Sequence, residues 1–444
     1  MKLSPTLFTA DQTSAIDHVY TSDKTMLIAN MGAGKTIISL TAIQELIDDG
    51  VLNKVLVIAP LKVCREVWRQ EAQKWEHTTL NVTFCEGDKA QRTNTVLTFD
   101  KGIMLLNFEN MQWFFTSFKN KFDGLLIDEL SKLKAGGKGF KKMRPHIPSF
   151  KWVLGMTGTP VAEDFAGLFY QVMAIDNGDR FGRNKSKFLI KYFTPDYNDY
   201  DWTLREDGAE NIVAALQDLV YTVPDYRHTL PPLTEKICYA DMPAEALEIY
   251  NQFTKTAVLD IDPPQTADNA AVLSGKLQQL SSGELYCEDE FGERIENYEL
   301  HTAKLEACKQ LVESLDQPVI ITYWYKHELA RLQILYPDAP TLSDPDAIDQ
   351  WNRGELPVLL VQPMSCSHGL QMQFGGPNLI FFAPVWSRDI REQMIARLWR
   401  KGQTQPVHVW EMVTRNTLDE LMVDRVNGKA IFDKMFRQFM EVTK

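Results

Sequence analysis

The sequence predicts an α/β protein with two parallel-sheet units and a helical insertion between them. Strand-like apolar runs alternate with helical patterns up to about residue 160, helical patterns dominate from 161 to 304, and a second alternating series follows from 305. Short, continuously apolar runs between helical patterns are typical of strands buried in a parallel sheet. Ligands of such sheets bind at the carboxyl ends of the strands, so the residues that follow each strand are the candidate site residues.

The individual elements follow from the apolar runs. The first series has runs that we interpret as strands at 25–28, 55–60, 103–107, 124–128 and 152–157, with a helical pattern at 63–75. The insertion carries helical stretches at 209–219, 244–258 and 270–280. The second series has strand-like runs at 319–323, 358–361, 379–382 and 407–413. The expected domains are therefore a first unit at 1–160, an insertion and crossover at 161–304, and a second unit at 305–444.

Composition narrows the class of protein. The 444 residues suffice for two or three domains, and 44% hydrophobic with 24% charged residues is ordinary for a globular chain. No apolar run reaches the ~18 residues that a membrane helix needs. The six cysteines form no C-x-x-C pair, so we expect a reducing, cytoplasmic location and no membrane partner. The net charge of −12 gives no global sign of nucleic-acid binding, which must then depend on a local basic segment.

The strongest local signal is a glycine-rich turn between the first predicted strand and a helical pattern. It reads Ala29-Asn30-Met31-Gly32-Ala33-Gly34-Lys35-Thr36. Glycines let backbone N–H groups close around phosphate oxygens, and the helix N-terminus adds partial positive charge. We expect Lys35 to reach the β- and γ-phosphates and the Thr36 hydroxyl to hold Mg²⁺. Because Ala29 replaces the first glycine of the usual pattern, a chance glycine turn is the alternative interpretation.

Two carboxylates end the strand predicted at 124–128. Asp128 at the strand tip is expected to hold Mg²⁺, directly or through water. Glu129 is expected to orient or deprotonate the attacking water. A solvated acidic turn is the alternative, but an acidic pair at this distance after a phosphate loop favours a nucleotide site.

A third cluster lies in the second unit. Gln393, Arg397 and Arg400 stand at i, i+4 and i+7, which predicts one helix face that carries all three. Two planar guanidinium groups suit a γ-phosphate because each binds oxygen pairs and stays protonated. Arg397 and Arg400 would then act as arginine fingers, worth roughly 10³–10⁵ in rate. The alternative is the basic face of a surface helix.

Together these motifs resemble the SWI/SNF-type ATPases of helicase superfamily two, from about Leu7 to Lys429. The most specific match runs from Gln393 to Gln403 and ends in Trp-Arg-Lys-Gly-Gln. The resemblance implies two RecA-like lobes, ATP and Mg²⁺ as cofactors, and a compact form of the bacterial or phage kind. It also implies that Gln12 reads adenine, and that the nucleotide site includes Met31, Gly32, Ala33, Gly34, Gly369 and Gln393. Leu130 and Ser131 depart from the family, which usually has Ala and His there.

A basic run without acids follows the carboxylate pair: Lys132, Lys134, Lys138, Lys141, Lys142 and Arg144. Its glycines predict a flexible loop, and its contacts with nucleic-acid phosphates would be salt-sensitive and independent of base sequence. A solvated surface is the alternative. Further nucleic-acid candidates, which lie after the second strand or near other strand ends, are Lys62, Arg65, Asn107, Thr322, Ser365 and Trp386.

The function favoured by these expectations is an ATP-driven motor that translocates along double-stranded DNA, with a protein partner that supplies targeting. A strand-separating DNA or RNA helicase shares every motif named above. A nucleotide-dependent DNA clamp or scaffold without productive stepping belongs to another class. The clamp or scaffold remains an alternative because of Ser131 and because Ala29 stands where the usual pattern has a glycine.

Overall fold

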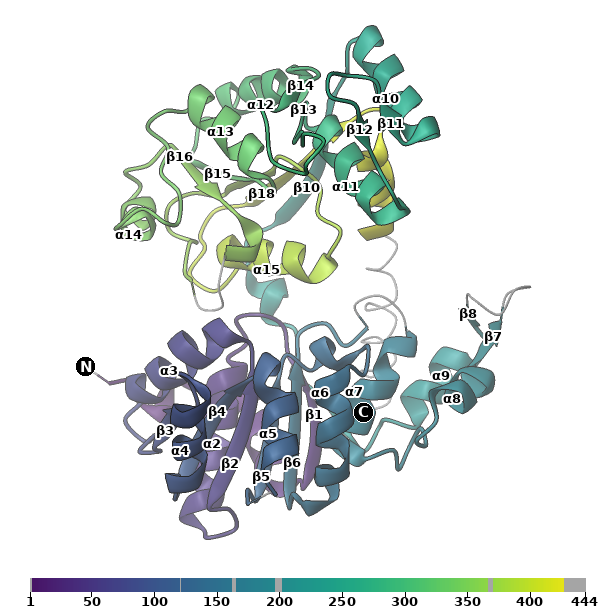
Figure 1. Ribbon diagram of the computed structural model, residues 1–444. Coiled ribbons are helices and arrows are strands. Elements are labelled where there is room, and N and C mark those ends of the chain that lie inside the picture. The colour runs from purple at the N-terminus through teal and green to yellow at the C-terminus, as the bar shows by residue number, and fades with distance from the viewer. Residues whose placement is uncertain (1, 120, 162–164, 196–201, 366–369, 427–444) are drawn as a thin grey trace. The chain divides into compact units, whose positions relative to one another are not determined.

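The computed structural model describes residues 2–119, 121–161, 165–195, 202–365 and 370–426 (Figure 1). Within these ranges the chain forms two compact units, one up to Tyr226 and the other from Arg227. Each unit is built on its own parallel sheet, which confirms the predicted α/β class with two parallel-sheet lobes. No helix in the described ranges is both long and apolar enough to cross a membrane.

The first unit contains a seven-stranded sheet in the order β3-β4-β2-β5-β6-β1-β9, with every neighbouring pair parallel. Its strands are β1 (Lys24–Ile28), β2 (Lys54–Ala59), β3 (Val82–Phe84), β4 (Gly102–Asn107), β5 (Gly124–Asp128), β6 (Trp152–Thr157) and β9 (Val220–Thr222). Alternate residues of the central strands enter two separate hydrophobic cores, one on each face of the sheet. Burial on both faces explains why these strands read as continuous apolar runs.

Nine α-helices of the first unit lie in the described ranges. They are α1 (Ala10–Thr21), α2 (Lys35–Asp48), α3 (Trp68–Lys74), α4 (Lys89–Thr98), α5 (Met111–Ser117), α6 (Lys138–Met143), α7 (Leu168–Asp176), α8 (Lys185–Tyr192) and α9 (Gly208–Ala214). A short antiparallel pair, β7 (Phe193–Pro195) and β8 (Trp202–Leu204), lies between α8 and α9 in the sequence.

The second unit has a five-stranded parallel sheet in the order β10-β18-β17-β15-β16. Its strands are β10 (Leu233–Ala240), β15 (Val319–Thr322), β16 (Val358–Val361), β17 (Asn378–Phe381) and β18 (Val407–Thr414). Its helices are α10 (Ala244–Thr256), α11 (Ala270–Ser281), α12 (Ala303–Glu313), α13 (Lys326–Leu335), α14 (Ala347–Asn352) and α15 (Arg388–Leu398). Two small hairpins pair β11 (Val258–Leu259) with β12 (Gln265–Thr266) and β13 (Glu284–Leu285) with β14 (Tyr298–Glu299).

The segment 161–304, which the sequence predicts as a helical insertion and crossover, also contributes one strand to each sheet. Strand β9 adds to the edge of the first sheet beside β1, whereas β10 adds to the edge of the second sheet beside β18. The structure therefore divides the chain near residue 226, inside the expected insertion. Both strands escape prediction because β9 is only three residues long and β10 contains the polar run Thr234-Glu235-Lys236; charged side chains are common in strands at a sheet edge.

Candidate nucleotide and nucleic-acid sites

The nucleotide candidates of the first unit gather at one edge of its sheet. Register pairs Ile28 of β1 with Thr157 of β6, and Met156 of β6 with Asp128 of β5. The carboxyl ends of these parallel strands therefore lie side by side, and the loop after β1 and the carboxylates after β5 share that edge. The sequence-predicted Lys35, Thr36, Asp128 and Glu129 are thus brought to one region of one unit.

The glycine-rich turn has the backbone shape that a phosphate loop requires. Gly32 and Gly34 have φ angles of +80° and +90°, which L side chains rarely adopt. A Cβ at Gly34 would lie 2.5 Å from Gln12 Nε2, and a Cβ at Gly32 would lie 2.5 Å from the Tyr226 hydroxyl oxygen. Helix α2 begins at Lys35, so its first N–H groups and the positive end of its dipole face the loop.

Three side chains hold the loop in this shape through its carbonyl oxygens. The Gln12 amide donates to Ala33 O at 3.0 Å, and the Lys35 ammonium donates to Ala29 O at 2.9 Å. The Tyr226 hydroxyl donates to Met31 O at 2.7 Å. Two N–H groups of the loop are also bonded within the protein, Ala29 N to Thr157 O at 3.1 Å and Ala33 N to Asn30 O at 3.2 Å, so the loop backbone is fixed from several sides.

The position of Gln12 follows from its place in a capping box. It is the third residue of α1, where its backbone N–H and side chain exchange hydrogen bonds with Thr9. Both ends of the Gln12 amide are therefore used within the protein, one on Thr9 N and the other on the phosphate loop. Its predicted reading of adenine stays a proposal.

Sequence reasoning missed Tyr226, which lies 195 residues from the carbonyl that it contacts. Replacing Tyr226 with Phe keeps the ring and removes the donor, so we expect the KM for ATP to rise about 2- to 10-fold with little change in kcat. That range corresponds to about 0.5–1.5 kcal/mol for one neutral hydrogen bond. Steady-state ATP hydrolysis measures both constants. Tyr20→Phe is the matched control, since that hydroxyl donates to Asp49 instead of the phosphate loop. Equal KM values in the two variants would contradict the prediction.

The carboxylate pair lies where β5 ends, and both side chains are buried, Asp128 to 6% and Glu129 to 8% exposure. The Trp68 indole N–H donates to Asp128 Oδ2 at 3.0 Å and fixes the direction of that carboxylate. Glu129 has a φ of +70°, an uncommon conformation for glutamate that carries strain of order 1–3 kcal/mol. Such strain is often found at functional sites, and here it turns the chain from β5 into the next helical turn.

The buried surroundings of Asp128 also affect a neighbouring thiol. Burial, and then the charge of Asp128, raise the pKa of Cys64 well above its usual range. Cys64 is therefore a protonated, packed thiol beside the carboxylate, not a nucleophile.

The residues present fit a Mg²⁺ ion. The predicted ligands, the Thr36 hydroxyl and the Asp128 carboxylate, are the oxygen donors that Mg²⁺ prefers. The described residues contain no cluster of three or more His, Cys, Asp or Glu side chains placed to hold a metal. A Mg²⁺ ion that binds together with the nucleotide needs no such cluster, because phosphate oxygens and water complete its coordination shell.

The arginine cluster lies in the second unit. Gln393 and Arg397 belong to α15, but Arg400 lies two residues beyond the helix end, so the predicted single helix face is wrong for Arg400. The helix ends because Trp399 leaves helical geometry, with φ −89° and ψ 82°. Arg397 and Arg400 still converge, since both donate to Leu370 O, at 3.5 and 3.2 Å. The predicted Gly369 lies outside the described residues.

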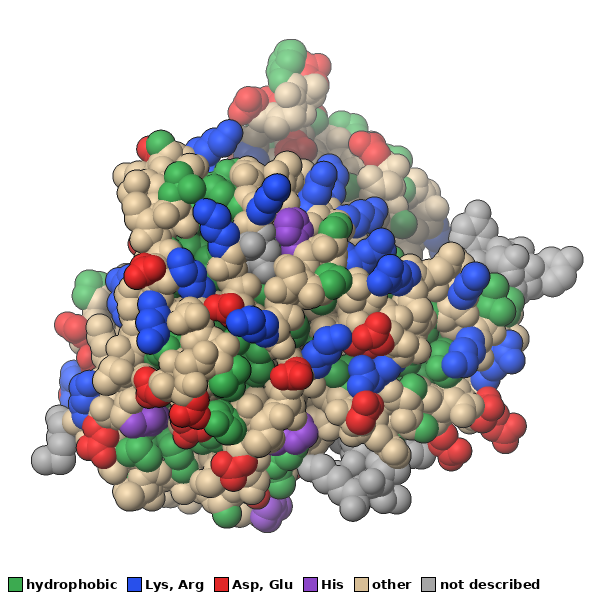
Figure 2. All heavy atoms as spheres, turned by 90° about the horizontal axis from the view of Figure 1, so that it is seen from below, with side chains coloured by type: hydrophobic (Ala, Val, Ile, Leu, Met, Phe, Trp, Pro, Cys, Tyr) green, Lys and Arg blue, Asp and Glu red, His purple; other side chains and the backbone are tan. Residues whose placement is uncertain are grey.

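The basic run after the carboxylates is an ordered segment, which corrects the predicted flexible loop. It forms a 3₁₀ turn at Leu130–Leu133 and the helix α6. Lys132, Lys138, Lys141 and Lys142 are exposed, whereas Lys134 and Arg144 are partly buried. Figure 2 shows one face of the protein, on which Lys and Arg side chains are interspersed with acidic ones, in keeping with local and not global basic character.

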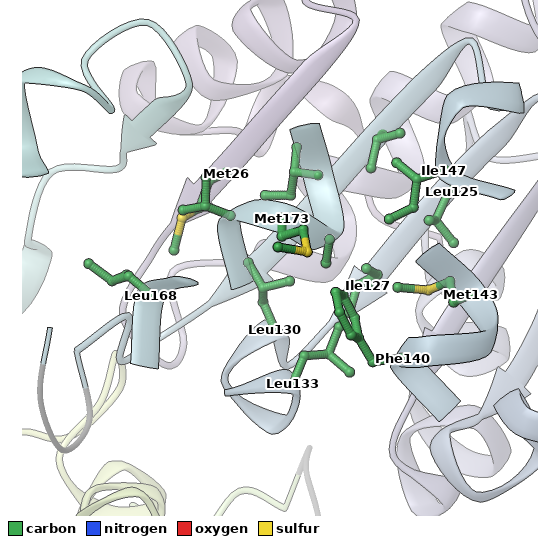
Figure 3. Close-up of a cluster of buried hydrophobic side chains, with 14 of the residues drawn as sticks. Met26, Leu125, Ile127, Leu130, Leu133, Phe140, Met143, Ile147, Leu168 and Met173 are labelled. Carbon is green, nitrogen blue, oxygen red and sulfur yellow. The ribbon is translucent and has the colours of Figure 1, made fainter. Parts of the chain in front are cut away.

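The segment is ordered because its apolar residues are anchored in the core on one face of the first sheet. Leu130, Leu133, Phe140 and Met143 are buried together with Ile127 of β5 (Figure 3). Since apolar and basic residues alternate along the segment, the anchored side chains leave the lysines at the surface.

The other nucleic-acid candidates have mixed surroundings. Lys62 is exposed at the start of the helix after β2, while Arg65 Nε lies 3.5 Å from Glu86 Oε2 and is partly neutralised. Asn107 ends β4 and donates to Glu109 Oε2 at 2.6 Å. In the second unit, Thr322 ends β15 and is buried, Ser365 donates to Gln362 Oε1 at 2.9 Å, and Trp386 lies 6.0 Å from the Arg425 guanidinium.

A glycine-rich loop between the first strand of a parallel sheet and a helix that begins at Lys35 defines the class: a phosphate-loop nucleotide-binding protein. The chain matches the SNF2-related domain over residues 12–291 and belongs to that family. It is therefore an ATPase of the SWI/SNF type, as the resemblance implied.

The proteins to which this chain is similar include one from a phage and one from a fruit fly. A protein described as "Putative protein p41" of Acyrthosiphon pisum secondary endosymbiont phage 1 is 29% identical over 452 residues, which cover 96% of this chain and 97% of that protein. A RAD54-like DNA repair and recombination protein of Drosophila virilis is 21% identical over 90% of this chain and 58% of its own length. The chain thus spans nearly all of the phage protein and about half of the repair protein. The SWI2/SNF2 ATPase core of Sulfolobus solfataricus, solved in complex with dsDNA, covers 96% of this chain at 18% identity and a TM-score of 0.45.

Proposed function

We propose that the protein is an ATP-driven motor that translocates along double-stranded DNA. The main support for this proposal is the exposed basic segment of α6. Its apolar residues are anchored in the core, and it directly follows the carboxylates of the nucleotide site. A movement of Asp128 and Glu129 when the bound nucleotide changes would therefore shift the first residues of that segment. A second support is that a RAD54-like DNA repair and recombination protein matches 90% of this chain.

Within this proposal each residue has a defined task. The loop N–H groups and Lys35 bind the phosphates, Thr36 and Asp128 hold the Mg²⁺, and Glu129 orients the attacking water for in-line attack. Bound Mg²⁺ supplies charge neutralisation on the phosphate oxygens. Trp68 keeps Asp128 in position, and Gln12 holds the loop. Arg397 and Arg400 complete the site with guanidinium groups that stabilise charge on the transferred phosphoryl group.

On the nucleic-acid side, the lysines of α6 contact phosphates and not bases. Such contacts are independent of sequence and release counterions, so binding falls steeply with salt. The other nucleic-acid candidates, at the strand ends, would contact the same sugar-phosphate backbone. Since phosphate contacts do not select a base sequence, a protein partner would supply targeting.

The test is steady-state ATP hydrolysis with no nucleic acid, duplex DNA, single-stranded DNA or RNA, each at two salt concentrations. Lys35→Ala is the blank, because it removes the phosphate-binding ammonium. We expect strong, salt-sensitive stimulation by duplex DNA, followed by displacement of a triplex-forming strand as evidence of translocation. Stimulation mainly by single strands or RNA would replace the proposal with a strand-separating helicase. No stimulation by any nucleic acid would replace it with the clamp or scaffold.

A further inference from the structure

A second basic segment lies outside every motif discussed so far, on and just before α8. Residues 180–192 contain five cations and no acid: Arg180, Arg183, Lys185, Lys187 and Lys191. Arg180 is neutralised by Asp176 and Asp218, at 3.4 and 2.5 Å. Among the described residues, the other four form no ion pair with a carboxylate, and Arg183, Lys187 and Lys191 are exposed.

The α8 segment is rigidly held with its lysines outward. Phe188 is 1% exposed and packs against Phe169 and Phe181, with ring centroids 5.3 and 4.8 Å apart. Tyr192, one turn later, is also buried. Lys187 and Lys191 stand four residues apart and directly precede these two anchors, so they lie together on the outer side of the helix.

The cations in the first turn of α8 are unfavourable for the stability of that helix. Lys185 and Lys187 lie in the first turn of α8, which contains no acid, although the positive end of the helix dipole disfavours cations there. Lys187 and Lys191 are like charges at i and i+4, a spacing that is also destabilising. Lys191 lies in the last turn, where the dipole favours cations, and Arg183 donates to Asn177 O at 3.2 Å. The cations that the helix itself disfavours are therefore Lys185 and Lys187, and an anionic ligand would explain them.

The α8 segment is continuous with the basic segment of α6. Tyr170 is the one residue of α7 that is not buried, and it contacts both segments. Its ring centroid lies 5.4 Å from that of Phe140 in α6 and 5.5 Å from the Lys185 ammonium. A Cβ added to Gly136 would lie 2.6 Å from the same ring, so the backbone that leads into α6 rests on it. Both segments belong to the first unit.

We propose that Arg183, Lys185, Lys187 and Lys191 extend the nucleic-acid track and contact the sugar-phosphate backbone of a duplex beyond the part held by α6. This inference rests on the proposed function. The aromatic residues of α8 are buried and unable to stack on bases, which favours backbone contacts over single-strand binding. The exposed side chains around the cations include one large apolar residue, Ile190, too little for the apolar core of a protein interface.

The test compares the double variant Lys187→Gln, Lys191→Gln with the parent in duplex-DNA binding, measured by fluorescence anisotropy over a series of salt concentrations. The slope of log K against log[salt] should become shallower by about 2, because each lost phosphate contact contributes about 0.9. The loss of affinity should be larger for a long duplex than for a short one. Lys89→Gln, Lys101→Gln is the matched control, since both residues are exposed, Lys89 at the start of α4 and Lys101 three residues after its end, near the opposite end of the sheet.

Thermal unfolding of both double variants should match the parent, because the substituted side chains are exposed. An unchanged salt slope, or equal changes in the two double variants, would overturn the inference and leave α8 as a surface for an acidic protein or for solvent. The two proposals fail separately. If duplex DNA does not stimulate the parent, the proposed function fails; if it does and the α8 variant binds like the parent, only the extension of the track fails.

Discussion

Arg400→Ala is expected to lower nucleic-acid-stimulated ATP turnover by about 10³-fold or more while leaving ATP binding largely intact. The reason is that a finger stabilises charge that develops only in the transition state, so its loss lowers kcat and not ground-state affinity. Single-turnover hydrolysis and equilibrium binding of a fluorescent ATP analogue measure the two quantities separately.

The local structure limits the side effects of the Arg400→Ala substitution on folding. Arg397 donates to the same Leu370 carbonyl as Arg400, so that carbonyl keeps a partner when Arg400 is shortened. Arg400→Lys keeps the charge but lacks the planar fork, and should recover little activity. Lys401→Ala, which removes a charge at the next position, is the control and should leave turnover near that of the parent. Parent-like turnover in Arg400→Ala would mean that this arginine does not reach the nucleotide.

Lys304→Met is expected to lower the free energy of unfolding of the second unit by about 3–5 kcal/mol, the range for breaking a buried ion pair by removing one partner. Lys304 and Asp419 form an ion pair in which both side chains are 0% exposed. Asp419 also accepts hydrogen bonds from the Ser281 hydroxyl at 2.7 Å and from Thr414 N at 3.0 Å. Without the ammonium, this carboxylate is left buried with neutral donors alone. Urea unfolding measures the change.

Lys309→Met on the same helix is the matched control. Its ammonium is exposed and lies 3.8 Å from Glu313, so the loss should stay within about 0.5 kcal/mol. Combining Lys304→Met with Asp419→Leu should destabilise less than the sum of the single changes, because the uncompensated charge is gone. A loss below about 1 kcal/mol for Lys304→Met would show that the pair is not important for stability.

The central strands were predictable because burial on both faces forces them to be continuously apolar. The predicted runs at 124–128, 152–157 and 358–361 coincide with β5, β6 and β16. The polar run Thr234-Glu235-Lys236 hides the role of β10 as an edge strand, although β10 pairs with β18 along eight residues. The glycine-rich loop could be placed because its geometry comes from two glycines within a few residues of each other.

The supports of the site were harder to predict than its central residues. Trp68 and Tyr226 act through hydrogen bonds to partners 60 and 195 residues away, and no local pattern encodes such a distance. The helix end before Arg400 depends on Trp399 leaving helical geometry, which i, i+4, i+7 spacing does not reveal. The glycines of the basic run predict a loop, yet its buried Phe140 and Met143 fix it on the core.

The chain passes from one unit to the other between two residues that have opposite attachments. Tyr226 donates to the phosphate loop, and the guanidinium of Arg227, the next residue, lies 5.7 Å from the ring of Trp399, the residue before Arg400. Whatever angle the units adopt, a single peptide bond joins the anchor of the loop to the anchor of the arginine segment. Because these two attachments lie on adjacent residues, a displacement of the Arg227 backbone passes through one peptide bond to the residue that holds the phosphate loop.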